Sequence, residues 1–186
     1  MKLLAKGKRG IVYLKNKNVV KRKLTEHYHP EEEARYLKIL NKKGIGPKLI
    51  SFDDNEIEMQ FIKGERIIDY IQKSSKKDIL EIIKKIFEQL YAMDKLGINK
   101  LELTNPYKHI IVKNKNPVMI DFERCIFTEK PKNATQFIQF LCSEKMSYIF
   151  KEKNILINKN ILFALAKIYK ENYNKKDLNK IIKMIK

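Results

Sequence analysis

Short apolar runs separated by turn residues fill the first third of the chain, and this pattern predicts an antiparallel sheet. Two of the runs flank a turn that contains Gly7 and Gly10, which indicates a β-hairpin. The expected strands lie within residues 3–14, which form the hairpin, and at residues 19–24, 48–52 and 57–62. The first part of the chain is therefore expected to be a small β structure.

One amphipathic helix is expected between these strands, opened by Pro30 and running to Leu40, with acidic residues in its first turn. Glu33 falls on the apolar, packing face of this helix. A carboxylate on a packing face needs a partner. Strand alternation within residues 19–24 allows Lys21 to point inward, so we expect Lys21 to pair with Glu33.

The remainder of the chain has a mostly helical pattern. Apolar residues at helical spacing predict a long helix from Lys76 that stops at Gly97, and a polar loop is expected at residues 99–108. Strands are expected at residues 109–112 and 118–121, and helices at residues 135–141, 155–169 and 177–185. The sequence thus predicts an α+β protein: a small antiparallel β part carrying one helix, followed by a helical part that bears a β-ribbon.

The composition is that of a folded, strongly basic chain. Its 186 residues are 44% hydrophobic, and 40 Lys and Arg against 22 Asp and Glu give a formal charge of +18. Such a charge attracts nucleotides, RNA, the ribosome or acidic proteins, although scattered lysines also fit a plain compositional bias. The two cysteines form no CxxC pair and no leader is evident, which predicts a cytoplasmic protein. No apolar run is long enough for a membrane span.

Two stretches carry candidate chemistry. An apolar run at residues 118–120 ends in Asp121, which is either an acid delivered to a cleft or an ordinary turn residue. The Gly-rich hairpin tip can bring backbone N–H groups close to phosphate oxygens, and Lys8 and Arg9 add positive charge there. As a plain hairpin turn, the tip would need no ligand.

Taken in order, these elements resemble the protein-kinase-like fold, especially small atypical members such as the RIO-type kinases, tRNA-modification-complex kinases and short archaeal predicted serine/threonine kinases. The similarity covers roughly residues 3–142. Its five elements are a Gly-rich loop at Ala5–Val12, the strand lysine Lys21, the helix glutamate Glu33, a hinge at Met59–Gly64, and Asp121-Phe122-Glu123 in place of the metal-binding Asp-Phe-Gly.

The resemblance implies a minimal bilobal kinase-like fold in one domain, residues 1–186, with an N-lobe of about residues 1–64 and a C-lobe of about residues 65–186. It implies an ATP-dependent serine/threonine-type kinase that uses Mg²⁺ or Mn²⁺ and transfers phosphate to a protein or to itself. The residues expected to bind the nucleotide are Gly7, Lys8, Arg9, Gly10, Val12, Lys21, Glu33, Met59, Gln60, Phe61 and Ile62. Lys21, Asp121 and Glu102 are the expected catalytic residues, with Asp121 and His109 as metal ligands.

The catalytic loop departs from the family pattern. Where the family has His-x-Asp, this chain has Lys100-Leu101-Glu102, so Glu102 would stand in for the catalytic aspartate or be an exposed loop acid. His109 matches the metal-binding asparagine only with a two-residue insertion, and counting without it reaches Tyr107. An activation loop of ordinary length is missing before Pro131. The alternatives to an active kinase are therefore a nucleotide-binding pseudokinase or scaffold, or a basic module that binds RNA or the ribosome.

Overall fold

Alternating apolar and polar residues at the start of the chain form a five-stranded antiparallel sheet in the computed structural model, which describes residues 1–186. The sheet order is β1-β2-β3-β5-β4. The strands are β1 (Lys2–Lys6), β2 (Gly10–Lys15), β3 (Asn18–Lys23), β4 (Leu49–Phe52) and β5 (Glu56–Gln60). Lys21 on the central strand β3 lies opposite Val12 of β2 and Ile57 of β5, so its register is fixed from both sides.

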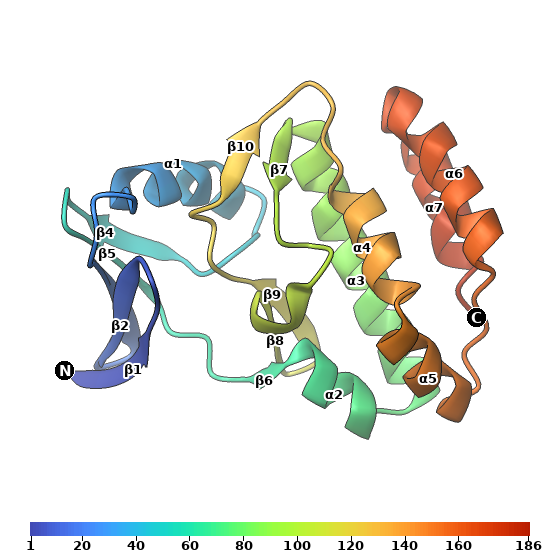
Figure 1. Ribbon diagram of the computed structural model, residues 1–186, viewed down its shortest axis with the longest axis horizontal. Coiled ribbons are helices and arrows are strands. Elements are labelled where there is room, and N and C mark those ends of the chain that lie inside the picture. The colour runs from blue at the N-terminus through green and yellow to red at the C-terminus, as the bar shows by residue number, and fades with distance from the viewer. The chain divides into compact units, whose positions relative to one another are not determined.

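Helix α1 (Pro30–Asn41) packs against β3, β4 and β5 (Figure 1). Pro30 occupies the first turn, where its missing N–H and fixed φ suit a helix start, and three glutamates follow it near the positive end of the helix dipole. The inner face of α1 buries Ala34, Leu37 and Leu40 completely. This face also buries Glu33, so the packing face of the helix carries one carboxylate among apolar side chains.

The chain divides into two compact units. Unit 1 comprises Met1–Lys63 and Val118–Cys125, and unit 2 comprises Gly64–Pro117 and Ile126–Lys186. The segment Val118–Cys125 therefore belongs to the same unit as the N-terminal sheet, although more than fifty residues of sequence separate it from Lys63. Its Phe122 is fully buried.

Unit 2 is mainly helical, and its longest helix, α3 (Lys76–Lys95), packs against α4 (Asn133–Leu141) and α7 (Lys175–Lys183) (Figure 1). The other helices are α2 (Ile67–Lys73), α5 (Glu144–Glu152), α6 (Lys159–Asn172) and the 3-10 turn η1 (Pro106–Lys108). Short strands complete the chain: β6 (Glu65–Arg66), β7 (Ile98–Lys100), β8 (Ile110–Lys113), β9 (Asn116–Met119) and β10 (Cys125–Phe127). None of the helices combines the length and apolar character needed to cross a membrane.

The expected α+β class, with an antiparallel N-terminal sheet, one helix and a helical remainder, is confirmed. Several local features differ from the expectations. The predicted loop at residues 99–108 contains the end of β7 and the turn η1, and helices α2 and α5 were not expected. The predicted helix at residues 155–169 begins later, because the Asn158 side chain caps it by accepting from the Ile161 N–H, while the backbone of Leu156 is hydrogen-bonded to that of Lys186.

We expect Gly46→Ala to destabilise the protein more than Gly44→Ala. Both glycines have positive φ, +81° and +68°, so each substitution carries backbone strain of about 1 kcal/mol. An added Cβ at Gly46 would lie 2.8 Å from Phe122 Cε2 and 2.9 Å from Leu37 Cδ2, whereas at Gly44 it would meet nothing within 4 Å. The overpacking at Gly46 should add about 1–3 kcal/mol, measured by urea unfolding. Equal losses in the two variants would contradict this packing.

Candidate functional site

The ammonium group of Lys21 is surrounded by three carboxylates of unit 1. Lys21 Nζ lies 2.9 Å from Glu33 Oε2, 2.7 Å from Asp121 Oδ1 and 2.8 Å from Glu123 Oε2. The Tyr28 ring centroid is 4.5 Å from the same nitrogen. Burial opposes the charged form of this lysine, but the nearby carboxylates outweigh it, so the pKa of Lys21 is raised well above its usual value.

Glu33 is fully buried, and each of its carboxylate oxygens accepts a hydrogen bond. Oε2 accepts from Lys21 Nζ and, at 2.7 Å, from the Tyr28 hydroxyl, and Oε1 accepts from the backbone N–H of Phe122 at 2.9 Å. Burial and the neighbouring Glu33 carboxylate raise the pKa of Tyr28, which keeps its hydroxyl a donor. The predicted contact between Lys21 and Glu33 is thus present, and Tyr28 and Phe122 hold the glutamate in place.

Asp121 lies beyond the end of its strand, and not at the strand end as expected. Strand β9 ends at Met119, and Asp121 has a φ of 64°, in the left-handed region that non-glycine residues adopt infrequently. The next residue, Phe122, anchors this segment through its buried ring and through its N–H to Glu33. The carboxylate of Asp121 is half-exposed beside Lys21, and backbone strain of this kind clusters at functional sites.

Glu123 was not among the expected site residues, yet it contacts two of them. Its carboxylate binds Lys21 Nζ, and its Oε1 lies 3.8 Å from Arg9 Nη1 on the hairpin tip. The carboxylates of Glu33, Asp121 and Glu123 present oxygen atoms within 4.8 Å of one another. Carboxylate oxygens are the ligands that Mg²⁺ prefers, so this group of acids fits a hard divalent cation in its chemistry.

The hairpin tip is a short turn between β1 and β2. The Gly7 N–H donates to the Gly10 carbonyl at 2.9 Å, and the Arg9 carbonyl accepts from the Leu24 N–H at 2.9 Å. A Cβ on Gly10 would lie 3.0 Å from the Arg22 carbonyl oxygen, so a side chain here would press on strand β3. Gly7, Lys8 and Arg9 are exposed, and Gly10 is buried.

The expected hinge begins in strand β5. Met59 and Ile62 are buried, and Met59 lies opposite Val19 of β3 and Leu49 of β4. The Gln60 N–H donates to the Lys48 carbonyl at 2.8 Å, and the Phe61 N–H donates to the Lys17 carbonyl at 3.2 Å. The backbone N–H groups of both residues therefore already donate within the protein. The backbone of Gln60 and Phe61 offers a purine only its carbonyl groups as hydrogen-bonding partners.

Glu102 and His109 belong to unit 2. Glu102 follows β7 in a turn and is not the exposed loop acid of the alternative reading: only 12% of its side chain is exposed. Its Oε2 lies 3.0 Å from Nζ of Lys100, whose side chain is fully buried. His109 is half-buried directly after η1, and its N–H donates to the Pro106 carbonyl. An imidazole suits Mg²⁺ less well than a carboxylate does.

A buried polar network holds the strand that precedes Glu102. The Asn133 side chain accepts from the Lys100 N–H at 2.8 Å and donates to the Ile98 carbonyl at 2.7 Å, so it is hydrogen-bonded to both ends of β7. Asp94 accepts from the Asn133 amide at 2.7 Å and from the Tyr169 hydroxyl at 2.9 Å. Burial raises the pKa of Asp94 to about 6, although these hydrogen bonds lower it. Sequence patterns gave no sign of this network, because its members come from separate helices.

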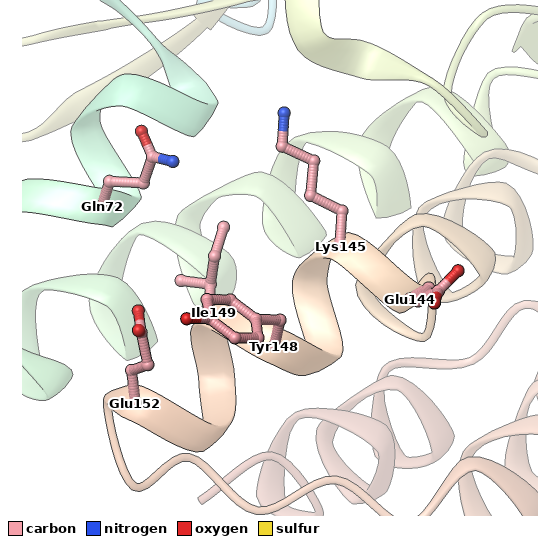
Figure 2. A pocket seen from close by; sticks show the side chains of 6 residues that line it. All are labelled: Gln72, Glu144, Lys145, Tyr148, Ile149 and Glu152. Carbon is pink, nitrogen blue, oxygen red and sulfur yellow. The ribbon is translucent and has the colours of Figure 1, made fainter.

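A pocket of about 390 Å³ lies between α2 and α5 in unit 2, and Figure 2 shows the side chains that line it. They are Gln72, Glu144, Lys145, Tyr148, Ile149 and Glu152. None of these residues was expected in the site, and the pocket is a surface feature with mixed charge. The chemistry that the sequence predicts lies elsewhere.

Comparisons with known proteins place the chain in a structural context. No family model matches the chain. The uncharacterized protein MJ1211 of Methanocaldococcus jannaschii is 30% identical over 86 residues, which cover 46% of this chain and 73% of MJ1211.

Solved structures with the protein-kinase-like fold are similar to the chain over most of its length. The streptomycin-ATP-APH(2")-IIa ternary complex has a TM-score of 0.56 at 15% identity and covers 98% of this chain and 92% of that one. The Rio2 kinase-ADP/Mg²⁺-phosphoaspartate complex from Chaetomium thermophilum has a TM-score of 0.56 at 14% identity and covers 83% and 56% of the two chains. These likenesses show a protein-kinase-like fold.

Asp94 should make the stability of the protein depend on pH. Its pKa rises from an ordinary 3.8 to about 6 on folding, so its contribution to stability is complete below about pH 4 and is lost as the pH rises through 6. The loss should total about 3 kcal/mol, because one pKa unit corresponds to about 1.4 kcal/mol. We expect the parent to lose stability relative to Asp94→Asn between pH 4 and pH 7, measured by urea unfolding. The control is Asp54→Asn, which removes an exposed carboxyl group. A pH-independent difference would contradict the raised pKa.

Proposed function

The chain belongs to the same family as MJ1211 and has the protein-kinase-like fold, and from this premise we propose that it is an ATP-dependent phosphotransferase. We propose further that residues 1–186 act as one kinase-like domain. The observation that carries the proposal is the buried ion pair between Lys21 and Glu33, with Asp121 against the same ammonium group. In protein kinases, a lysine paired with a glutamate and an aspartate that holds the metal ion must both be in place for phosphoryl transfer.

Lys21 would donate hydrogen bonds to the α- and β-phosphates. Its ammonium stays charged, since the carboxylates raise its pKa well above the usual value. Glu33 would hold the ammonium in position while the nucleotide binds, because the Tyr28 hydroxyl and the Phe122 N–H fix the glutamate independently of Lys21. Positioning of this kind supplies much of the catalysis in phosphoryl transfer, which needs little covalent chemistry from the protein.

Asp121 is the residue that we propose as ligand to Mg²⁺ or Mn²⁺. Its carboxylate is a hard oxygen ligand, and 36% of its side chain is exposed, so it can reach a metal–nucleotide complex from solution. When bound, the metal ion would neutralise phosphate charge. His109 was the second expected ligand, and we propose it as the weaker of the two, because an imidazole is a softer ligand than Mg²⁺ prefers.

The hairpin tip and the hinge would complete the nucleotide site. Gly7 and Gly10 let the backbone approach phosphates, Lys8 and Arg9 add charge, and Val12 on β2 would contact the base or sugar. Met59, Gln60, Phe61 and Ile62 would contact the adenine. Because the N–H groups of Gln60 and Phe61 already donate within unit 1, we propose that carbonyl groups and apolar contacts provide most of the recognition at these two residues.

The acceptor that we propose is a serine or threonine hydroxyl of a protein, including this chain itself. The resemblance to small atypical kinases supports this choice, while one of the similar structures contains streptomycin and the other contains phosphoaspartate. Glu102 would orient the hydroxyl. Incubation with γ-labelled ATP, with and without an added aminoglycoside, followed by phosphosite mapping, separates the two acceptor classes. Label on the aminoglycoside alone would overturn the protein-kinase assignment.

We expect Lys21→Met to abolish the stabilisation of the protein by ATP and Mg²⁺. The substitution removes the cation that would bind the phosphates, and it leaves Glu33 as an unpaired buried charge, so the variant itself should lose about 3–5 kcal/mol of stability. The shift in Tm on adding ATP is therefore measured for each variant against its own nucleotide-free Tm. The control is Lys23→Met. Lys23 lies on the same strand, and its amine pairs with the exposed Glu26. An unchanged ATP-dependent shift in Lys21→Met would sink the assignment.

Asp121→Asn and Glu102→Gln should separate metal binding from orientation of the acceptor. Asp121→Asn should weaken Mg²⁺-dependent ATP binding and abolish transfer. Glu102→Gln should leave the ATP affinity nearly intact and lower turnover by about 10- to 100-fold, the signature of an interaction made mainly in the transition state. Isothermal titration with ATP and a γ-phosphate transfer assay measure the two effects. Equal turnover in the parent and Glu102→Gln would refute the role of Glu102, and ATP binding without turnover in the parent would make the protein a pseudokinase.

A further inference from the structure

Glu123 connects the two basic groups that the proposed nucleotide site offers to phosphates. One carboxylate oxygen lies 2.8 Å from Lys21 Nζ, and the other lies 3.8 Å from Arg9 Nη1 on the Gly-rich tip. The side chain is 16% exposed, so it is reachable from solution. A carboxylate that forms ion pairs with both cations lies where a phosphate oxygen would contact them.

The three carboxylates around Lys21 differ in how firmly they are held. Glu33 is fully buried and also accepts from Tyr28 and from the Phe122 N–H, so an incoming anion cannot move it. The contacts of Glu123 are instead to the cations themselves, on the long side chains of Lys21 and Arg9. Glu123 is therefore a carboxylate that an anion can replace at both cations without breaking the buried part of the cluster.

We propose that the Glu123 carboxylate occupies the phosphate position in the nucleotide-free protein, and that a triphosphate binds by displacing it. The proposal deepens the function proposed above and rests on it in one respect, that Lys21 and Arg9 are the phosphate-binding cations. No covalent step is involved. Glu123 thereby sets the nucleotide affinity and blocks the site against weaker anions.

The net charge of the cluster predicts how Mg²⁺ affects the binding of a triphosphate in place of the Glu123 carboxylate. Glu33, Asp121 and Glu123 outnumber Lys21 and Arg9, so the cluster carries one net negative charge that repels a free triphosphate. Glu123→Gln keeps the shape of the side chain and makes the cluster neutral. The parent should therefore need Mg²⁺ for tight triphosphate binding, and the variant should need it less.

The experiment uses inorganic tripolyphosphate as the probe, because it tests the anion site without the adenine. Titration calorimetry with and without Mg²⁺ is run on the full chain as the parent, as Glu123→Gln and as Glu58→Gln. Glu58 is a matched control: it also belongs to unit 1, is 14% exposed and pairs with Lys15. We expect Glu123→Gln to bind metal-free tripolyphosphate about tenfold more tightly or better, while Glu58→Gln stays within about twofold of the parent.

Three other outcomes would decide against the proposal. An unchanged or weaker affinity in Glu123→Gln overturns it, and weakening only in the presence of Mg²⁺ would instead make Glu123 a metal ligand. Tight tripolyphosphate binding that survives Lys21→Met in the Glu123→Gln background would place the anion elsewhere and overturns it as well. Tighter tripolyphosphate binding by Glu123→Gln, together with no preference for ATP, would support the inference and refute the proposed function, so the two failures are distinguishable.

Discussion

The burial of the Glu33 carboxylate is the constraint on which the rest of unit 1 depends. A fully buried charge is tolerated only where donors surround it, because desolvation costs several kcal/mol. Its donors come from three parts of the chain: Lys21 of β3, Tyr28 before α1, and the Phe122 N–H of a segment far along the sequence. The packing of α1 against the sheet and the attachment of Val118–Cys125 to unit 1 are therefore linked through one side chain.

This arrangement favours an anion site over a merely stable core. An apolar residue at position 33 would remove the desolvation cost, and such replacements of buried ion pairs are often neutral or stabilising. The pair present here instead keeps Lys21 charged and in contact with Asp121 and Glu123. Perturbed groups of this kind gather at functional sites, and the strained backbone at Asp121 points the same way.

The sequence was sufficient for the parts of the site that rest on local periodicity. Strand alternation and the helical face together predicted that Lys21 and Glu33 meet, since each rule acts within a few residues. The contacts of Lys21 with Asp121 and Glu123 span about a hundred residues, and no local pattern reports them. Tyr28 lies only five residues before Glu33, but it precedes the helix, so the pattern of the helical face did not include it.

The errors in the helical part have a comparable origin. Helix α5 begins at a clear cap, Ser143, whose side chain accepts from the Met146 N–H, and its buried Met146, Ile149 and Phe150 follow helical spacing. The helix has only nine residues, and its short apolar pattern was not recognised in the sequence. Ile155, in contrast, is buried in a segment without regular secondary structure, so its apolar character indicated packing and not a helix. Capping residues located these boundaries better than hydrophobicity did.

The proposed role of Glu102 in place of an aspartate also has a physical basis. A glutamate has one more rotatable bond than an aspartate, and this freedom would make its position in a catalytic loop less well defined. Here the carboxylate is tied to the buried ammonium of Lys100, and the Lys100 backbone is in turn held by Asn133. Phosphoryl transfer through a loose transition state requires orientation of the acceptor more than a strong base. In the proposed role, the tether to Lys100 would restore the positional order that the longer side chain loses.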